Sequence, residues 1–315
     1  MNDSARTERE VAALLERSGE RAGAGRTAVE ISRRRLNAVT RTDSVSGVVE
    51  VGAGIEMDRI ERELRPHQLT LGPLSPGMAG LDVAAFLEGP YAGLRALPGG
   101  ALESSCIALT AIMADGLRYV SRPSPRSAAG PDLDVLFLGG NGRFGLITSA
   151  TLRLFGRPQT ERWAAFSFGS SGGTVAFVRA AAASGAWLRS AALARHGERF
   201  TARVEVIGSP EAVERDLATI GHEAMARGGR ASGRDMEPAP PPAAEERELS
   251  WEELAQAIGA GDEVRCWRLA SESVVAVGAG EHGLSLSRGG EWANREVLAA
   301  ALAAADPGGV LGGLP

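Results

Sequence analysis

Hydrophobic and polar residues alternate along the segment that follows a glycine-rich stretch near the middle of the chain. Ala150, Leu152 and Leu154 would point to one side of an extended chain, and the polar residues between them to the other. Alternation at period two is typical of a half-buried strand, so residues 147–154 are predicted to form one. The short apolar run 135–138 lies before the glycines, and we expect a second strand there.

Similar patterns predict a mixture of helices and strands over the rest of the chain. Apolar residues at helical spacing, with capping residues such as Ser209 followed by Pro210, indicate helices. Helices are expected at residues 5–21, 56–65, 171–184 and 209–227, and from 250 onward. Strands are expected at residues 29–31, 48–51, 107–113, 119–120, 163–168, 200–207, 263–269 and 273–277.

The order of these elements predicts an α+β protein of two domains. At 315 residues the chain can hold one large domain or two modest ones. Composition changes after Pro158, so we expect a first domain at residues 27–157 and a second at 158–315. Residues 1–26 are expected to form a separate N-terminal helix. The proline-rich segment 237–246 is expected to be an exposed loop.

Composition and charge exclude several classes of function. A net charge of −5 gives no basic surface for nucleic acid. Two distant cysteines form neither a metal motif nor a disulfide framework, so buried free thiols and no metal site are expected. The sequence shows no signal peptide and no apolar run of membrane-spanning length, which predicts a cytoplasmic protein.

The central glycines satisfy a dinucleotide-binding pattern by letter but not by context. Gly140, Gly142 and Gly145 fit G-x-G-x-x-G. That fingerprint must open a helix, because helix amides hold the pyrophosphate. Here the glycines open a predicted strand, so a Rossmann domain is not expected.

A longer stretch around the glycines resembles a known family. The residues that match its pattern are Pro125, Arg126, Gly130, Pro131, Asp132, Gly139, Gly142, Gly145, Ile147 and Thr148. The stretch is similar to the FAD-linked oxidases with a vanillyl-alcohol-oxidase or PCMH-type flavin domain. It is closest to the alkylglycerone-phosphate synthases, and next to glycolate oxidase flavin subunits. The resemblance implies a PCMH-type FAD-binding domain, shortened at its N-terminus, and a smaller α+β C-terminal-type domain of the FAD-linked oxidases.

The resemblance also implies FAD as cofactor and a set of residues that contact it. Glycines let backbone amides approach a ring or a phosphate closely. Arg126 is expected to clamp a substrate or phosphate, and no catalytic residue is assigned. The expected FAD contacts are Gly80, Asp82, Ala84, Ala85, Gly139, Gly140, Asn141, Gly142, Arg143, Phe144, Gly145, Leu146, Ile147 and Thr148.

Two departures from the family pattern predict an eroded flavin site. The family has a glycine-rich pyrophosphate loop ahead of the first of these strands, and no such loop precedes Thr27. In an ungapped register, Ala84 and Ala85 replace a glycine pair, and Asp82 brings a carboxylate toward the diphosphate. A shifted register in which Gly77 or Gly80 supplies the close approach stays open.

The sequence therefore predicts an FAD-binding oxidoreductase-family protein with a small-molecule substrate that the residues do not identify. The second half of the chain has no tyrosine, and its histidines, His196, His222 and His282, are scattered. One alternative is a non-catalytic degenerate homologue that acts as a subunit or binding module. Another is a chain whose missing loop comes from a flavin-bearing partner, within a homo- or hetero-oligomer.

Overall fold

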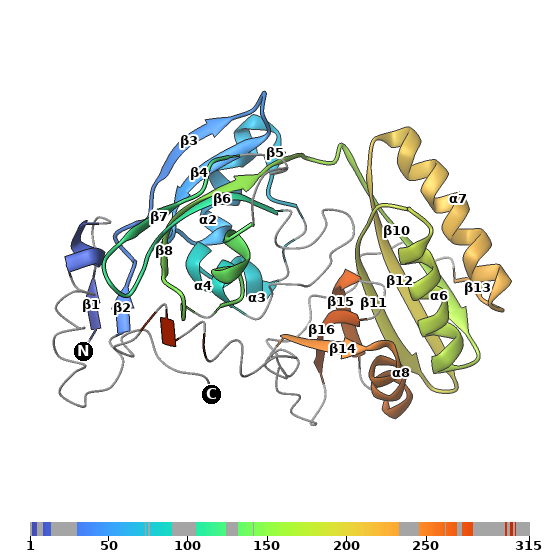
Figure 1. Cartoon of the computed structure of the whole chain (residues 1–315). Coiled ribbons are helices and arrows are strands. Elements are labelled where there is room, and N and C mark those ends of the chain that lie inside the picture. Colours follow the sequence, from blue (N-terminus) through green and yellow to red (C-terminus); the bar gives the residue numbers. More distant parts are fainter. Residues whose placement is uncertain are drawn as a thin grey trace.

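The fold contains two large β-sheets, each with its own helices (Figure 1). The computed structural model describes residues 2–4, 9–13, 30–72, 74, 76–89, 105–123, 132–140, 142–232, 246–261, 263–269, 273–279, 300, 303–304 and 306. Within these ranges no helix is long and apolar enough to cross a membrane.

The first sheet has five antiparallel strands, and β8 lies at its centre. The strand order is β3 (Val39–Asp43), β4 (Val48–Gly52), β8 (Leu146–Arg153), β6 (Cys106–Ile112) and β7 (Arg118–Val120). The strand predicted after the glycines is thus confirmed as β8. Its residues Ala150 and Leu152 are buried, as the alternation predicted, but Thr151 between them is buried too, so the predicted half-buried strand is a central strand with both faces covered.

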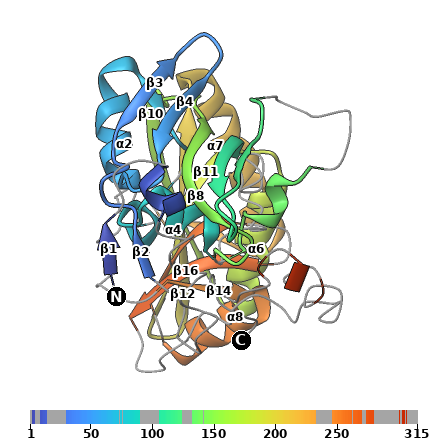
Figure 2. The same ribbon diagram turned by 60° about the vertical axis from the view of Figure 1, so that its left-hand side comes forward.

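Short helices pack against this sheet and complete its hydrophobic core. They are α2 (Met57–Leu64), the 3-10 turn η1 (Arg65–His67), α3 (Pro76–Ala79) and α4 (Val83–Glu88). Helix α4 lies against β8, and Figure 2 shows the same arrangement from a second side. Ile60 and Leu64, the predicted apolar face of α2, are both buried. The backbone N–H of Ala84 donates to the carbonyl of Ala53 at 2.8 Å, which joins α4 to the turn after β4.

The second sheet has seven strands and carries three helices on the side away from the first sheet (Figure 1). The strand order is β13 (Arg230–Ala231), β10 (Thr160–Phe168), β12 (Arg199–Gly208), β11 (Leu188–His196), β15 (Glu263–Leu269), β16 (Ser273–Ala279) and β14 (Glu246–Ser250). The helices are α6 (Ser171–Ala183), α7 (Pro210–Ala226) and α8 (Trp251–Ala260). Their apolar faces and the strands bury Phe168, Phe177 and Val206 in a second core.

Capping residues explain where two of these helices begin. Ser209 accepts a hydrogen bond from the N–H of Ala212 at 3.2 Å, and Pro210 follows at the first turn of α7, as predicted. Ser250 and Glu253 form a reciprocal capping box at the start of α8.

A short connection joins the two sheets. Strand β9 (Phe155–Gly156) pairs with β5 (Leu69–Thr70), so the chain leaves the first sheet in extended form. The N–H of Arg157 then donates to the carbonyl of Gln68 at 2.8 Å, and the N–H of Gln159 donates to the carbonyl of Gly208 at 3.1 Å. The connection is thereby hydrogen-bonded to both sides. Near the N-terminus, β1 (Asn2–Ser4) and β2 (Glu30–Ser32) form a parallel pair.

The prediction of a strand at residues 135–138 is wrong. Residues Asp134–Leu136 form the 3-10 turn η2, and Phe137 and Leu138 continue it as a turn. Asp132 starts this turn, because its Oδ1 atom accepts the N–H of Asp134 at 3.1 Å. Phe137 and Leu138 are buried in the core, which accounts for the second half of the apolar run. Val135 and Leu136 in its first half are exposed.

Two further predictions fall mostly on segments outside the described residues. Residues 9–13 of the predicted N-terminal helix are helical, and the rest of residues 5–21 lies outside the description. Of the predicted proline-rich loop 237–246, only Glu246 is described, and it begins β14.

Candidate functional site

The glycine-rich turn lies directly before β8 and against α4. The N–H of Gly139 donates to the carbonyl of Leu87 at 2.8 Å, which ties the turn to the last part of α4. Phe144, Ile147 and Thr148 are buried, whereas Arg143 is partly exposed. Asn141 and Arg126, two predicted site residues, lie outside the described residues.

Close packing within the chain explains two of the glycines. A Cβ atom on Gly140 would lie 2.4 Å from the carbonyl oxygen of Leu136. A Cβ atom on Gly145 would lie 2.9 Å from the carbonyl oxygen of Ile112 and equally close to the ring of Phe137. These positions need glycine so that the turn can pack, whether or not a ligand lies there.

Helix α4 begins after Asp82, the residue whose carboxylate the family resemblance predicts to lie near the cofactor diphosphate. Asp82 is the N-cap of α4, and its Oδ1 atom accepts the N–H of Ala85 at 2.7 Å. Ala84 is fully buried, while Ala85 and Gly80 are exposed. The amide at this helix start is therefore hydrogen-bonded to an acid of the same chain.

A buried ion pair that the sequence did not predict lies at the end of this helix. Arg33 forms a bidentate pair with Glu88, with Nη2 and Oε2 separated by 2.9 Å. Glu88 is 6% exposed and accepts the N–H of Ile147 at 2.8 Å. Arg33 also donates to the carbonyl of Ile147 at 3.3 Å. Both backbone groups of Ile147 are therefore bonded to this pair.

The electrostatic environment keeps Arg33 charged despite its burial. Desolvation by itself would lower the pKa of Arg33, but the charge and hydrogen bonds of Glu88, with a contribution from Asp82, raise the pKa above its ordinary value. A signal for this pair was present in the sequence, because Glu88 ends the apolar run of α4. An acid in such a position is rarely buried without a partner.

A tyrosine and an aspartate hold the turn that leads into the glycines. The Tyr119 hydroxyl donates to Oδ1 of Asp134 at 2.8 Å, and the Tyr119 ring stacks on Phe137 at 4.9 Å between centroids. Burial is the main cause that raises the pKa of Asp134, and its hydrogen bond from Tyr119 opposes the rise. This pair fixes η2 to the edge strand β7.

The seven-stranded sheet carries a second group of paired charges. Glu205 on β12 is buried and accepts hydrogen bonds from Ser190 at 2.7 Å and from Arg189 at 3.1 Å. Burial raises the pKa of Glu205, and the charge of Arg189 opposes the rise. Beside it, the guanidinium of Arg265 lies 5.3 Å from the centre of the Trp163 ring.

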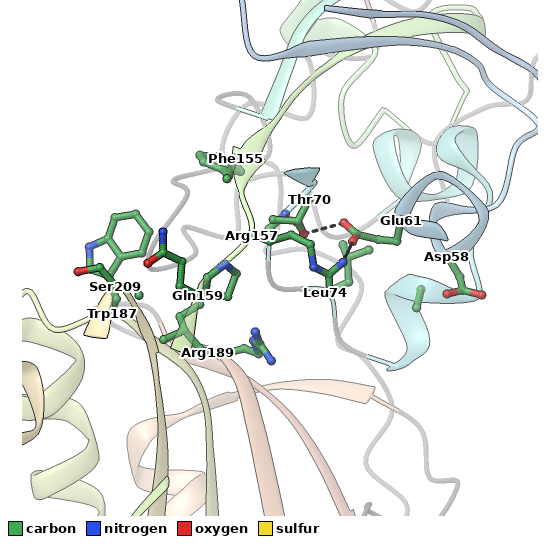
Figure 3. A pocket seen from close by; sticks show the side chains of 16 residues that line it. Asp58, Glu61, Thr70, Leu74, Phe155, Arg157, Gln159, Trp187, Arg189 and Ser209 are labelled. Atoms are coloured by element: carbon green, nitrogen blue, oxygen red, sulfur yellow. Dashed lines mark hydrogen bonds and ion pairs between the residues drawn. The ribbon is translucent and has the colours of Figure 1, made fainter. Parts of the chain in front are cut away.

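A pocket of about 610 Å³ lies at the seam between the two sheets (Figure 3). We call it the seam pocket. One wall comes from α2, β5 and α3, the floor from the connection after β9, and the other wall from the starts of β11 and α7. Its lining residues are Asp58, Glu61, Thr70, Gly72, Leu74, Ala79, Phe155, Gly156, Arg157, Pro158, Gln159, Trp187, Arg189, Ile207, Gly208 and Ser209.

The structure places the two segments of the predicted flavin site next to each other, and the three histidines that it describes lie apart. Helix α4, with Asp82, Ala84 and Ala85, contacts the turn and the start of β8. His67, His196 and His222 are exposed on separate elements. Among the described residues, no group of three or more His, Cys, Asp or Glu side chains could hold a metal ion. Cys106 and Cys266 are buried free thiols, as predicted.

Comparison with known proteins identifies the class to which this site belongs. Residues 6–120 match a family model described as an FAD binding domain. Over 134 residues the chain is 29% identical to the mitochondrial D-lactate dehydrogenase [cytochrome] 1 of Saccharomyces cerevisiae, which covers 42% of this chain and 22% of that protein. Over 154 residues it is 22% identical to the alkyldihydroxyacetonephosphate synthase of Caenorhabditis elegans, which covers 49% of this chain and 26% of that protein.

Solved structures show the same fold. A structure of alkyldihydroxyacetonephosphate synthase superimposes with a TM-score of 0.75 at 13% identity, over 99% of this chain and 75% of that one. A structure of p-cresol methylhydroxylase superimposes with a TM-score of 0.67 at 12% identity, over 98% of this chain and 87% of that one.

These findings define an FAD-binding domain within a PCMH-type α+β fold. The resemblance to the FAD-linked oxidases is thereby confirmed, and FAD is the cofactor that the matched domain implies. The matched segments span about a quarter of the length of these two curated relatives.

Proposed function

We propose that this chain is an FAD-linked oxidoreductase-family protein whose flavin site is eroded, so that it holds FAD weakly. The observation that carries the proposal is the Asp82 carboxylate, which caps α4 where the family resemblance expects the cofactor diphosphate. The substrate is not assigned by any side chain near the turn.

The charge of Asp82 is large enough to matter. Two like charges about 4 Å apart repel by about 4 kcal/mol at a surface-like dielectric. A lost amide donor to a charged acceptor adds about 1.5–3 kcal/mol, and here the N–H of Ala85 is already bonded to Asp82. Every increment of about 1.4 kcal/mol changes a dissociation constant tenfold. These two contributions would therefore raise the dissociation constant for FAD from the nanomolar range to the micromolar range or beyond.

The Arg33–Glu88 pair supports the same proposal. Backbone N–H and C=O groups at the start of β8 are what a nucleotide could bind, and those of Ile147 are bonded to this pair instead. A ligand that needed them would have to displace a buried ion pair, which costs several kcal/mol.

A flavin titration tests the proposal on the full chain. FAD and FMN would each be titrated, with binding measured by flavin fluorescence and by the melting temperature of the protein. We expect dissociation constants of roughly 1 µM or weaker, and FAD no tighter than FMN, because the diphosphate and adenosine add nothing at an eroded site. A yellow protein that retains FAD through dialysis would contradict the erosion.

A second candidate function is a non-catalytic homologue that keeps the scaffold alone. The specific observation in its favour is that the N–H of Ala85 and both backbone groups of Ile147 are already bonded to side chains of the same chain. An absence of FAD and FMN binding at millimolar concentration would favour this candidate. Co-purification with a flavin-bearing partner would instead favour a chain that is completed by another subunit.

A further inference from the structure

The seam pocket has the size of a small-molecule site and lies apart from the predicted flavin contacts. Its volume of about 610 Å³ falls within the range of roughly 300–1,000 Å³ that is typical of ligand pockets. None of the predicted FAD contacts that the structure describes is among its lining residues. Ligand binding in the seam pocket is therefore independent of the proposed flavin function.

A half-exposed tryptophan forms one wall of the pocket. The Trp187 side chain is 49% exposed although it is the largest apolar side chain in the lining. Its backbone is held on both sides, because its N–H donates to Asp216 at 3.0 Å and its carbonyl accepts the N–H of Ile207 at 2.9 Å. The backbone that carries the indole is thus fixed, and the half-exposed ring offers surface on which a flat ring can stack.

The charged groups of the pocket are already paired within the chain. Glu61 accepts the Thr70 hydroxyl at 2.9 Å and the N–H of Leu71 at 2.6 Å, and lies 3.8 Å from Arg157 (Figure 3). Arg189 donates to Glu205 at 3.1 Å and to Glu161. An ionic ligand would have to compete with these pairs, so the chemistry of the lining favours an uncharged one.

Polar anchors remain for an uncharged ligand. Figure 3 shows the Gln159 carboxamide beside Trp187, with the Ser209 hydroxyl close to the same ring. A carboxamide both donates and accepts, and a hydroxyl that accepts the N–H of Ala212 still has its own proton to donate. Leu74, Phe155 and Ile207 supply the apolar surface of the pocket.

We propose that the seam pocket binds an uncharged, flat aromatic molecule that stacks on Trp187 and carries a hydroxyl or carbonyl group within reach of Gln159. The juxtaposition of an open indole, a carboxamide and self-paired charges selects this class of ligand.

The test is a binding experiment with 2-naphthol on the full chain at pH 7 without added flavin. Calorimetry and saturation-transfer NMR would measure the dissociation constant, which we expect at roughly 0.1–1 mM for a ligand of this size. The anion 2-naphthoate has the same ring system and tests the preference for an uncharged ligand. We expect it to bind about fivefold more weakly or worse, because it competes with the internal ion pairs.

Variants locate the binding. Trp187→Ala should weaken 2-naphthol binding about tenfold or more, and Gln159→Met, which keeps the backbone N–H, about threefold. Met225→Ala removes an exposed apolar side chain outside the pocket lining and should leave the dissociation constant of 2-naphthol unchanged. The proposal is overturned if 2-naphthol does not bind at a few millimolar, if 2-naphthoate binds as well or better, or if Trp187→Ala and Gln159→Met both bind like the natural chain.

Discussion

Arg33 and Glu88 lie 55 positions apart in the sequence and form a bidentate ion pair in the interior of the first sheet's core. Because Glu88 also accepts the N–H of Ile147, the pair joins three segments: the residues after β2, the end of α4 and the start of β8. The region that is predicted to contact FAD is therefore held together by the chain's own charges.

Removing one partner of this pair should be costly. Glu88→Ala would leave the Arg33 guanidinium buried without its counter-charge and the N–H of Ile147 without an acceptor. We expect the free energy of unfolding to fall by about 3–5 kcal/mol, measured by urea denaturation. Glu63→Ala breaks an exposed ion pair with Arg59 and serves as the control, with an expected change of at most about 0.5 kcal/mol. Equal effects of the two substitutions would show that the buried pair is not structural.

Removing the charge of Asp82 should improve flavin binding. In Asp82→Ser the N-cap hydroxyl still accepts the amide of α4, so stability should change by less than about 0.5 kcal/mol. The repulsion with a diphosphate is lost, and we expect FAD to bind at least about tenfold more tightly, with FMN affected less. Asp58→Ser, which removes an exposed acid on α2, is the charge control. An unchanged FAD affinity in Asp82→Ser would argue against a diphosphate at this helix start.

Gly145 should be required for folding and not only for a cofactor. Gly145→Ala would press a methyl group against the carbonyl of Ile112 and the ring of Phe137, and should lower the free energy of unfolding by about 1–3 kcal/mol without any flavin present. Gly156→Ala in β9 is the matched control, since a Cβ there meets no atom within 4 Å. Thermal or urea unfolding of both variants measures the difference.

The raised pKa of Asp134 predicts a pH dependence of stability. An acid whose pKa is higher in the folded state binds its proton more readily there, so its ionisation weakens the fold as pH rises through that pKa. Asp134→Asn keeps an acceptor for Tyr119 and removes the ionisation. We expect this variant to gain stability relative to the natural chain at pH 7, and the gain to disappear as pH falls to about 4, the ordinary range of a carboxyl group. A difference between the two proteins that is constant from pH 4 to 7 would refute this account.

Local patterns in the sequence were enough to predict most of the elements that form the cores. The alternation after the glycines predicted β8, and the cap at Ser209 predicted α7, because both signals are set by neighbouring residues. The family resemblance assigned the residues around Ala84 and the glycine-rich turn to one cofactor, and Leu87 and Gly139 of these two segments are hydrogen-bonded to each other. Their contact with FAD stays a prediction. The domain boundary predicted at residue 158 stays a prediction.

The features that the sequence did not predict depend on partners that are distant in the chain. The position of Glu88 after an apolar run indicates that this acid has a partner, but nothing in the sequence indicates that the partner is Arg33. The run 135–138 was taken for a strand because its apolar letters do not reveal that Asp134 is bonded to Tyr119. Strand β11 was not predicted because its alanines give a weak strand signal, and its pairing with β12 on one side and β15 on the other makes it extended.

The connection between the sheets also determines how the seam pocket behaves. Arg157, Pro158 and Gln159 alone stand between β9 and β10, and the first and last of them are hydrogen-bonded to opposite walls. A rotation of one sheet against the other that keeps both bonds must come from the backbone dihedrals between Arg157 and Gln159, and the ring of Pro158 fixes one of these dihedrals. The width of the seam pocket is therefore linked to the backbone conformation of these three residues, and so is the shape that a ligand must match.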